Sequence, residues 1–294
     1  MKLNSIHMRD PFVLADSVSQ QYYLYGTTDA DPWKAEGVSF EAYTSCNLQE
    51  WEGPFTVFKA EENFWGTHNF WAPEVHVYRG RYYLFASFKS PTKRRGTHIL
   101  VADNPLGPFK PVSDEPATPT QWECLDGTFF LDDQQKPYMV FCHEWVQVHD
   151  GEVCAQQLSE DLSTPVGEPI LLFKASEARW PKLLARRDGS NLVDARVTDG
   201  PFLYRKSDGT LLMLWSSVAA EGYAMGYARS LSGTLLGPWK QEPQPLISSD
   251  GGHGMTFTSF EGSLFLTYHS PNKTPFERPF FVRLREVDGG LECR

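Results

Sequence analysis

Five short openings of similar composition recur along the chain, and each leads into an apolar strand that folds back through a polar turn. They contain small groups of Asp, Gly, Pro or His: Asp10-Pro11-Phe12-Val13, Trp71-Ala72-Pro73-Glu74-Val75, Leu125-Asp126-Gly127-Thr128-Phe129, Thr198-Asp199-Gly200-Pro201-Phe202 and Gly252-His253-Gly254-Met255-Thr256. Repetition of a strand-forming unit at a regular interval is typical of a β-propeller, in which each repeat forms one blade.

Each opening is followed by further apolar segments, so the repeats are predicted to form hairpins. The second strands are expected at 21–25, 81–85, 137–141, 211–215 and 264–268, and the third strands at 37–45, 98–102, 153–158, 223–229 and 280–284. Counted from Asp10, Ala72, Asp126, Asp199 and His253, the openings are 62, 54, 73 and 54 residues apart. This spacing suits four-stranded blades. We predict an all-β fold, a five-bladed β-propeller with four-stranded antiparallel blades, in one domain over residues 1–294.

Composition excludes several kinds of partner. The formal net charge is −10, which argues against nucleic acid because phosphate binding needs a basic face. There is no long apolar run, so no membrane-spanning helix is expected. Aromatic residues make up 14% of the chain, and their flat rings are suitable platforms for sugars. The first nine residues lack the apolar core of a signal peptide, so a cytoplasmic location is expected.

Three of the openings contain an aspartate, which we expect at the same place in each repeat: Asp10, Asp126 and Asp199. If each first strand begins beside the propeller axis, the three carboxyl groups converge there. The loops into the first strands and those joining second to third strands then surround one mouth of the axis, where a pocket is expected. Crowding and burial favour a protonated carboxyl group, so one aspartate could activate water while another protonates a glycosidic oxygen.

At these residues the sequence resembles glycoside hydrolase family 43, five-bladed propellers that cleave arabinose- or xylose-containing polysaccharides with inversion of the anomeric centre. The resemblance covers essentially the whole chain. It is carried by Asp10-Pro11, Trp71-Ala72-Pro73-Glu74-Val75, Asp126 ahead of Phe129-Phe130-Leu131-Asp132-Asp133, Asp199-Gly200-Pro201-Phe202-Leu203-Tyr204, Trp215-Ser216-Ser217 with Gly222-Tyr223, and Gly252-His253-Gly254.

The resemblance implies three catalytic roles. Asp10 would be the general base, Asp126 would orient the acid and raise its pKa, and Asp199 would stand where the family has its general acid. That acid is usually a glutamate before Gly-Pro, and an aspartate is shorter by one methylene, or about 1.5 Å. The backbone or substrate could shift to compensate, Glu221 or Glu144 could take the role, or the protein could bind sugar without efficient cleavage.

Aromatic residues near the second opening are predicted to bind the sugar. Trp71 is the expected stacking platform, with His68 and Phe70 beside it, and core packing is the competing interpretation. Trp33, Trp145 and Trp180 stand in polar, loop-like surroundings, where they could provide further platforms.

The resemblance also implies an arginine and an ion. Arg278 falls where the family places a pocket arginine, and Arg9 is next to Asp10. His253, between two glycines, falls where many relatives have a histidine near a central calcium or other ion; such an ion would be structural. A lone histidine is a weak metal signal, and no cofactor is expected to be required.

The expected function is hydrolysis of oligosaccharides or polysaccharides as an α-L-arabinofuranosidase or β-xylosidase. The alternative from another class is a carbohydrate-binding propeller with weak or no hydrolysis. A lesser alternative is a retaining enzyme like the β-fructosidases, since Trp122-Glu123-Cys124 and Arg9-Asp10-Pro11 resemble their motifs in a different order. The sugar, the linkage and the oligomeric state are left open by the sequence.

Overall fold

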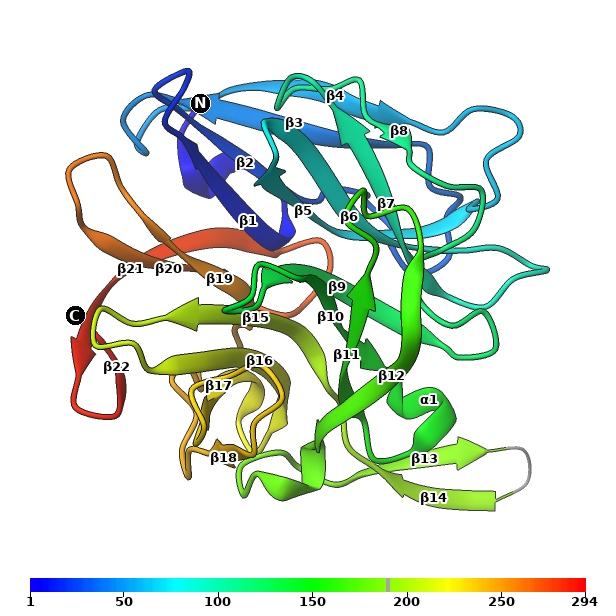
Figure 1. Ribbon diagram of the computed structural model, residues 1–294, viewed down its shortest axis with the longest axis vertical. Coiled ribbons are helices and arrows are strands. Elements are labelled where there is room, and N and C mark those ends of the chain that lie inside the picture. Colours follow the sequence, from blue (N-terminus) through cyan, green and yellow to red (C-terminus); the bar gives the residue numbers. More distant parts are fainter. Residues whose placement is uncertain (189–190) are drawn as a thin grey trace.

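The computed structural model describes residues 1–188 and 191–294, which consist almost entirely of antiparallel strands (Figure 1). The strands of this part of the chain form five four-stranded sheets and one two-stranded hairpin. Each four-stranded sheet is made from consecutive strands, so each is one blade built from one stretch of sequence. The prediction of a five-bladed, all-β propeller with four-stranded antiparallel blades is confirmed.

The blades follow one another along the chain. Blade 1 contains β1 (Arg9–Asp16), β2 (Gln21–Thr27), β3 (Ser39–Ser45) and β4 (Glu52–Lys59). Blade 2 contains β5 (His68–Tyr78), β6 (Arg81–Lys89), β7 (Gly96–Ala102) and β8 (Lys110–Pro111). Blade 3 contains β9 (Cys124–Leu131), β10 (Pro137–His143), β11 (Glu152–Leu158) and β12 (Pro165–Lys174).

Blade 4 contains β15 (Asp199–Arg205), β16 (Leu211–Ala219), β17 (Gly222–Ser230) and β18 (Trp239–Gln241), and blade 5 contains β19 (Gly252–Thr258), β20 (Leu264–Ser270), β21 (Arg278–Val287) and β22 (Gly290–Cys293). Between blades 3 and 4 the chain forms the hairpin of β13 (Leu184–Asp188) and β14 (Asn191–Ala195). The short helices are η1 (Leu3–Ser5), α1 (Trp145–Val148) and η2 (Ala175–Glu177). No helix in the described residues is long and apolar enough to cross a membrane.

The apolar second strands lie in the middle of the blades. Every residue of β10 is buried, as are the first seven of β16, because each blade packs against a neighbour on both faces. The outermost strands are more exposed, and Val166, Ile170 and Leu171 of β12 face solvent. This difference explains why the second strands appear in the sequence as continuous apolar runs.

The first strands form the inner wall of the ring. β1 contacts both β5 and β19, and β15 contacts both β9 and β19. Blade 5 closes the ring against blade 1, where Met255 and Phe257 share one apolar core with Phe12 and Tyr22. The openings of all five repeats therefore meet near one axis.

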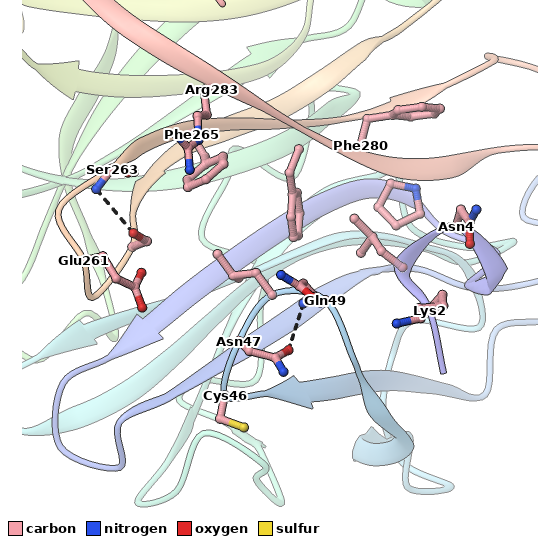
Figure 2. A pocket seen from close by; sticks show the side chains of 15 residues that line it. Lys2, Asn4, Cys46, Asn47, Gln49, Glu261, Ser263, Phe265, Phe280 and Arg283 are labelled. Atoms are coloured by element: carbon pink, nitrogen blue, oxygen red, sulfur yellow. Dashed lines mark hydrogen bonds between the residues drawn. The ribbon is translucent and has the colours of Figure 1, made fainter.

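A surface groove of about 930 Å³ lies where blades 1 and 5 meet on the outside of the ring (Figure 2). Cys46, Asn47 and Gln49 from the β3–β4 turn form one side, and Phe265 and Arg283 from blade 5 form the other. None of the three aspartates of the openings lines this groove.

Candidate active site

The start of every first strand has the same irregular backbone. One position that recurs in every repeat has a φ between 45° and 57°, in the left-handed region that most residues avoid; it is occupied by Asp10, Ala72, Asp126, Gly200 and His253. The residue just before it pairs with the end of the second strand, in the pairs Arg9–Thr27, Trp71–Ser87, Leu125–Cys142, Asp199–Ser216 and Gly252–His269. This conformation recurs in all five blades, so it belongs to the fold rather than to one residue type.

The repeated backbone corrects one prediction. Asp10 and Asp126 occupy the left-handed position, but Asp199 stands one residue earlier, and Gly200 has the left-handed φ of 49°. The three aspartates are therefore not at the same place in their repeats. The bulge at the start of the strand nevertheless brings Asp199 to the same cavity as the other two.

The cavity at this end of the axis has a volume of about 210 Å³. The three aspartates and His253 line it, together with Trp71 and Trp145. It also receives residues from the β2–β3 and β20–β21 loops, Trp33 and Asn272. The predicted pocket between the strand openings and the loops that join second to third strands is thus present.

Asp10 is surrounded by groups that favour its ionised form. The Thr27 hydroxyl donates to Oδ2 at 2.8 Å, and Nδ1 of His253 lies 3.2 Å from Oδ1. Burial raises the pKa of Asp10, but His253, then Arg9 and His269, and the Thr27 hydrogen bond outweigh it, so the pKa is below its usual value. Asp10 is therefore a carboxylate at neutral pH.

Asp126 is in the opposite situation. Burial and the negative charge of Asp10 raise its pKa well above the usual value, and the backbone N–H of Gly200, which donates to Oδ2 at 3.0 Å, only partly opposes them. Nδ1 of His253 is 3.7 Å from the same oxygen.

Asp199 has a pKa near neutrality. Burial is the main cause, followed by the charge of Asp126, and together they raise the pKa of Asp199 to about 7 against the opposing effects of His253 and Tyr223. Its carboxyl group is partly accessible from the cavity. A sugar ring in the cavity would displace the water there, so the effect of burial would be complete only in the occupied site. Asp10 and Asp199 thus have pKa values on opposite sides of the usual range, as acid/base catalysis requires.

The two histidines are held by well-defined contacts. Nδ1 of His269 accepts the backbone N–H of Asp10 at 3.1 Å, while Nε2 faces the Asn272 side-chain oxygen at 3.2 Å, which places the proton of a neutral ring on Nε2. Burial lowers the pKa of His269 to about 4, in agreement with a neutral ring. Nδ1 of His253 lies between the carboxyl groups of Asp10 and Asp126.

These contacts bear on the ion that is expected near His253. Within residues 1–188 and 191–294, no group of three or more His, Cys, Asp or Glu side chains is arranged to hold a metal ion. Nδ1 of His253 contacts the carboxyl groups of Asp10 and Asp126, so it is not free to bind an ion. The side chains present do not fit a directly coordinated ion, and we derive no step through one.

Trp71 and Trp145 lie at the cavity, as predicted. The indole N–H of Trp71 donates to the Pro32 carbonyl at 2.7 Å, and the Arg95 guanidinium lies 4.3 Å from the centre of the Trp71 ring. Arg95 in turn is bound to Glu144 and Asn69. The Trp71 ring is therefore fixed before any ligand arrives, while Trp145 begins α1 at another side of the cavity.

Four predicted binding residues lie elsewhere. Trp180 is 9% exposed and packs against Trp215 in the core. Phe70 is 1% exposed and packs among Phe40, Phe58 and Phe88, so it belongs to the core and has no surface to offer a sugar. His68 contacts Thr67 at 2.8 Å and does not line the cavity, because in β5 the bulge separates it from Trp71.

Arg278 is also displaced from the predicted place. It begins β21 and donates to the carbonyl groups of Pro275 and Glu277. The arginine that lines the cavity is Arg9, whose Nη1 is 2.6 Å from Glu277 Oε1. The buried carboxylate of Glu277 holds Arg9 at the cavity, whereas Arg278 is held at the start of β21 by backbone carbonyl groups.

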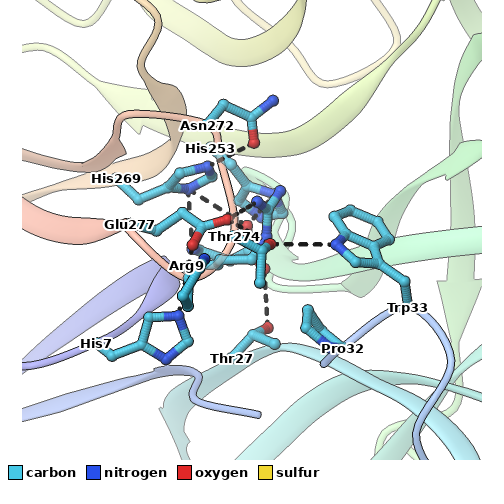
Figure 3. Close-up of polar contacts among 12 residues, drawn as sticks. His7, Arg9, Thr27, Pro32, Trp33, His253, His269, Asn272, Thr274 and Glu277 are labelled. Carbon is cyan, nitrogen blue, oxygen red and sulfur yellow. Dashed lines mark hydrogen bonds and ion pairs between the residues drawn. The ribbon is translucent and has the colours of Figure 1, made fainter. Parts of the chain in front are cut away.

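The cavity is bordered on one side by a contact between two loops (Figure 3). The indole N–H of Trp33, in the β2–β3 loop, donates to the Thr274 hydroxyl at 3.2 Å, and that hydroxyl donates to Glu277 at 2.7 Å. The guanidinium of Arg9 lies 4.8 Å from the centre of the Trp33 ring. The sequence indicated Trp33 but not Thr274 or Glu277, because the contacts of Thr274 with Trp33 and of Glu277 with Arg9 join residues more than two hundred positions apart.

The other acidic candidates differ in position. Glu144 lines the cavity, buried against Arg95. Glu221 is exposed at the turn between β16 and β17. Glu123 does not line the cavity and is paired with Lys89 and Arg94, so the carboxyl group needed by the β-fructosidase alternative is directed elsewhere.

Comparison with known proteins identifies the family. The sequence model of Glycosyl hydrolases family 43 matches residues 4–287. The chain belongs to this family. It is therefore a glycoside hydrolase, and its substrate is a carbohydrate.

Solved structures agree with this assignment. The family-43 chain is 43% identical to a structure described as an endo-arabinase from Bacteroides thetaiotaomicron, with a TM-score of 0.91 over 99% of this chain and 98% of that one. It is 27% identical to a thermostable family-43 glycoside hydrolase, with a TM-score of 0.81 over 100% of this chain and 96% of the other. Xylosidase/arabinosidase 43A of Humicola insolens is 32% identical over 89 residues, 30% of this chain and 26% of that protein.

Proposed function

We propose that the protein is an inverting glycosidase that removes terminal arabinose or xylose units from plant oligosaccharides or polysaccharides, as an α-L-arabinofuranosidase or β-xylosidase. The observation that carries this proposal is the pair of aspartates, Asp10 and Asp199, that line one cavity and have opposite pKa shifts. The pKa of Asp10 is lowered, and that of Asp199 is raised to about 7. One carboxyl group is thus ready to accept a proton and the other to donate one.

In the proposed reaction, water attacks the anomeric carbon while Asp10 removes a proton from it. Asp199 donates its proton to the glycosidic oxygen as the bond from that oxygen to the anomeric carbon breaks. Asp126 supports the acid, because its charge and its place beside Asp199 raise the pKa of Asp199. The shorter reach of an aspartate is accommodated by the start of β15, where Asp199 precedes a bulge and is supported by Tyr223.

The size and border of the cavity favour action at a chain end. Its volume of about 210 Å³ is below the range of roughly 300–1,000 Å³ of sites for drug-sized ligands, so it suits one sugar ring rather than a segment of a polymer. The contact between Trp33 and Thr274 borders the cavity on the side between blades 1 and 5. The name of the Bacteroides relative specifies endo action by that protein, and this chain is proposed to differ from it.

Matched aspartate variants test the chemistry. Wild type, Asp10→Asn, Asp199→Ala and the surface control Asp103→Asn are assayed with 4-nitrophenyl pentosides and with arabino- and xylo-oligosaccharides, and the product anomer is assigned by NMR. Asp10→Asn should lose about 10²–10⁴-fold in kcat/KM on all substrates. Asp199→Ala should lose as much on oligosaccharides but far less on 4-nitrophenyl pentosides, because 4-nitrophenolate leaves without protonation.

The other outcomes point to the alternatives. Sugar binding without hydrolysis by wild type at any pH would favour a carbohydrate-binding propeller. Retention of the anomeric configuration would favour the β-fructosidase-like alternative. Equal losses in Asp199→Ala on both kinds of substrate would exclude Asp199 as the acid.

A further inference from the structure

Hydrogen bonds between neighbouring blades follow a repeated rule at the axis. In four blades, the second-strand residue that pairs with the opening accepts the backbone N–H of the left-handed residue in the next blade. The links are Thr27 Oγ1 with Ala72 at 2.9 Å, Ser87 Oγ with Asp126 at 2.9 Å, Ser216 Oγ with His253 at 2.8 Å, and His269 Nδ1 with Asp10 at 3.1 Å. The last link closes the ring from blade 5 to blade 1.

Blade 3 departs from this rule. Its residue at the same register is Cys142, which pairs with Leu125 and is completely buried. A thiol sulfur is a weak hydrogen-bond acceptor, and the Cys142 side chain interacts with Thr198 instead. The N–H of Gly200, the left-handed residue of blade 4, donates to Oδ2 of Asp126 at 3.0 Å.

We propose that Cys142 is a positioning residue. Because its thiol is not a strong hydrogen-bond acceptor at this register, the N–H of Gly200 remains free to donate to Asp126. The inference rests on the proposed function, in which Asp126 supports the acid Asp199. Cys142 itself takes no part in the reaction.

The consequence is a direct link between two functional groups. Gly200 follows Asp199 in β15, so the bond to Gly200 ties Asp126 to the strand that carries the acid. Blade 1 shows the effect of a hydroxyl acceptor at the register of Cys142, where Thr27 stands. The Thr27 hydroxyl stands between the Asp10 carboxylate and the N–H of Ala72, bonding to both. With a hydroxyl at position 142, Asp126 would share or lose its direct bond to blade 4.

Two substitutions separate this role from simple packing. Cys142→Ser places an oxygen where Ser87 and Ser216 accept an N–H in their blades, while Cys142→Ala removes the thiol and adds no acceptor. Cys142→Thr, which reproduces the side chain that Thr27 supplies in blade 1, is a second acceptor variant in case the serine variant does not fold. Thermal unfolding of each variant reports the loss of packing.

Two measurements are made on each variant. The first is the amide proton shift of Gly200 in protein labelled with ¹⁵N-glycine, assigned through its Asp199 neighbour and compared with Asp126→Ala. The second is kcat and KM on an arabino- or xylo-oligosaccharide. A change of acceptor changes the chemical shift of an amide proton, so Cys142→Ser should move the Gly200 signal away from its wild-type position. The same variant should lower kcat about tenfold with little change in KM. Cys142→Ala should leave the Gly200 signal near its wild-type position and should change kcat and KM by no more than about threefold.

The inference is overturned if the serine and alanine variants agree in both measurements, since Cys142 would then only fill space. It is also overturned if the Gly200 signal moves in Cys142→Ser while kcat does not. The amide signal needs no turnover, so an inactive wild type would end the proposed function while the signal still reports which acceptor Gly200 uses.

Discussion

Tyr223 donates its hydroxyl group to Oδ2 of Asp199 over 3.0 Å, and its ring stacks on His269. Burial raises the pKa of Tyr223 well above its usual value, so it remains a donor throughout the working pH range. Asp199, the proposed acid, is therefore held by two strands of blade 4, β15 and β17.

Tyr223→Phe should move the alkaline limb of activity to higher pH. The hydrogen bond from Tyr223 lowers the pKa of Asp199, so its removal raises that pKa and keeps the acid protonated further into the alkaline range. A bond to a charged group corresponds to a shift of about one pH unit. The measurement is kcat/KM against pH for both proteins, and an alkaline limb that stays in place or moves down would contradict the assignment.

The wild-type profile itself should be bell-shaped and displaced to acidic pH. Activity requires Asp199 to be protonated, and its pKa of about 7 means that kcat/KM falls as pH rises through about 7. Activity also requires Asp10 to be ionised, and its lowered pKa places the acid limb below the usual range for aspartate. If kcat/KM begins to fall only several pH units above 7, another group is the acid.

Arg9→Ala and Arg278→Ala form a matched pair of arginine substitutions. Arg9 lowers the pKa of Asp10, so its loss should raise that pKa and move the acid limb to higher pH. It also leaves Glu277 buried without its guanidinium partner, at a cost of about 3–5 kcal/mol in the free energy of unfolding. Arg278→Ala should stay within about threefold of wild type in kcat/KM. Chemical denaturation and pH profiles measure both effects, and the reverse ranking would restore Arg278 as the pocket arginine.

Opening the contact between Trp33 and Thr274 should alter the products. Thr274→Val removes the hydroxyl that accepts the indole N–H, and Trp33→Ala removes the wall itself. We expect wild type to release only single sugars from a linear oligosaccharide from the earliest times, and Trp33→Ala to release some longer fragments. Chromatography of early products checks this. Longer fragments from wild type would mean that the closed side does not determine the mode of action.

Phe70→Ala tests the correction of a predicted binding residue. The ring packs among Phe40, Phe58 and Phe88, so its loss should reduce the free energy of unfolding by about 3–5 kcal/mol. The KM of the remaining folded protein should be nearly unchanged, whereas Trp71→Ala, at the cavity, should raise KM. If fully folded Phe70→Ala has a higher KM than wild type, the Phe70 ring does contribute to sugar binding.

The repeat pattern predicted the blades because local chemistry repeats with them. Apolar second strands such as 211–215 are buried between blades wherever the propeller closes, so their composition alone indicates their place. The hairpin of β13 and β14 and the short helix α1 have no counterpart in the other repeats, and no sequence pattern predicted them.

The site was predictable only in part. Asp10, Asp126 and Asp199 could be named from the openings, and Trp71 and Trp145 from their surroundings. A closer comparison of the second-strand ends would have paired Thr27, Ser87, Ser216 and His269, because all four carry acceptors at one register. Glu277 and Thr274 gave no such signal, since each acts through loops from distant blades.

Residue order along the chain was enough to specify five hairpin repeats and to gather their acidic openings at one axis, because each blade forms from contiguous strands. Closure of the ring determined the rest. It placed Arg9 rather than Arg278 at the cavity, and it buried Phe70 among Phe40, Phe58 and Phe88. These outcomes depend on which side chains from separate blades come into contact in the folded protein. The burial of a group and the charges near it are set by those neighbours, so they cannot be read from the sequence.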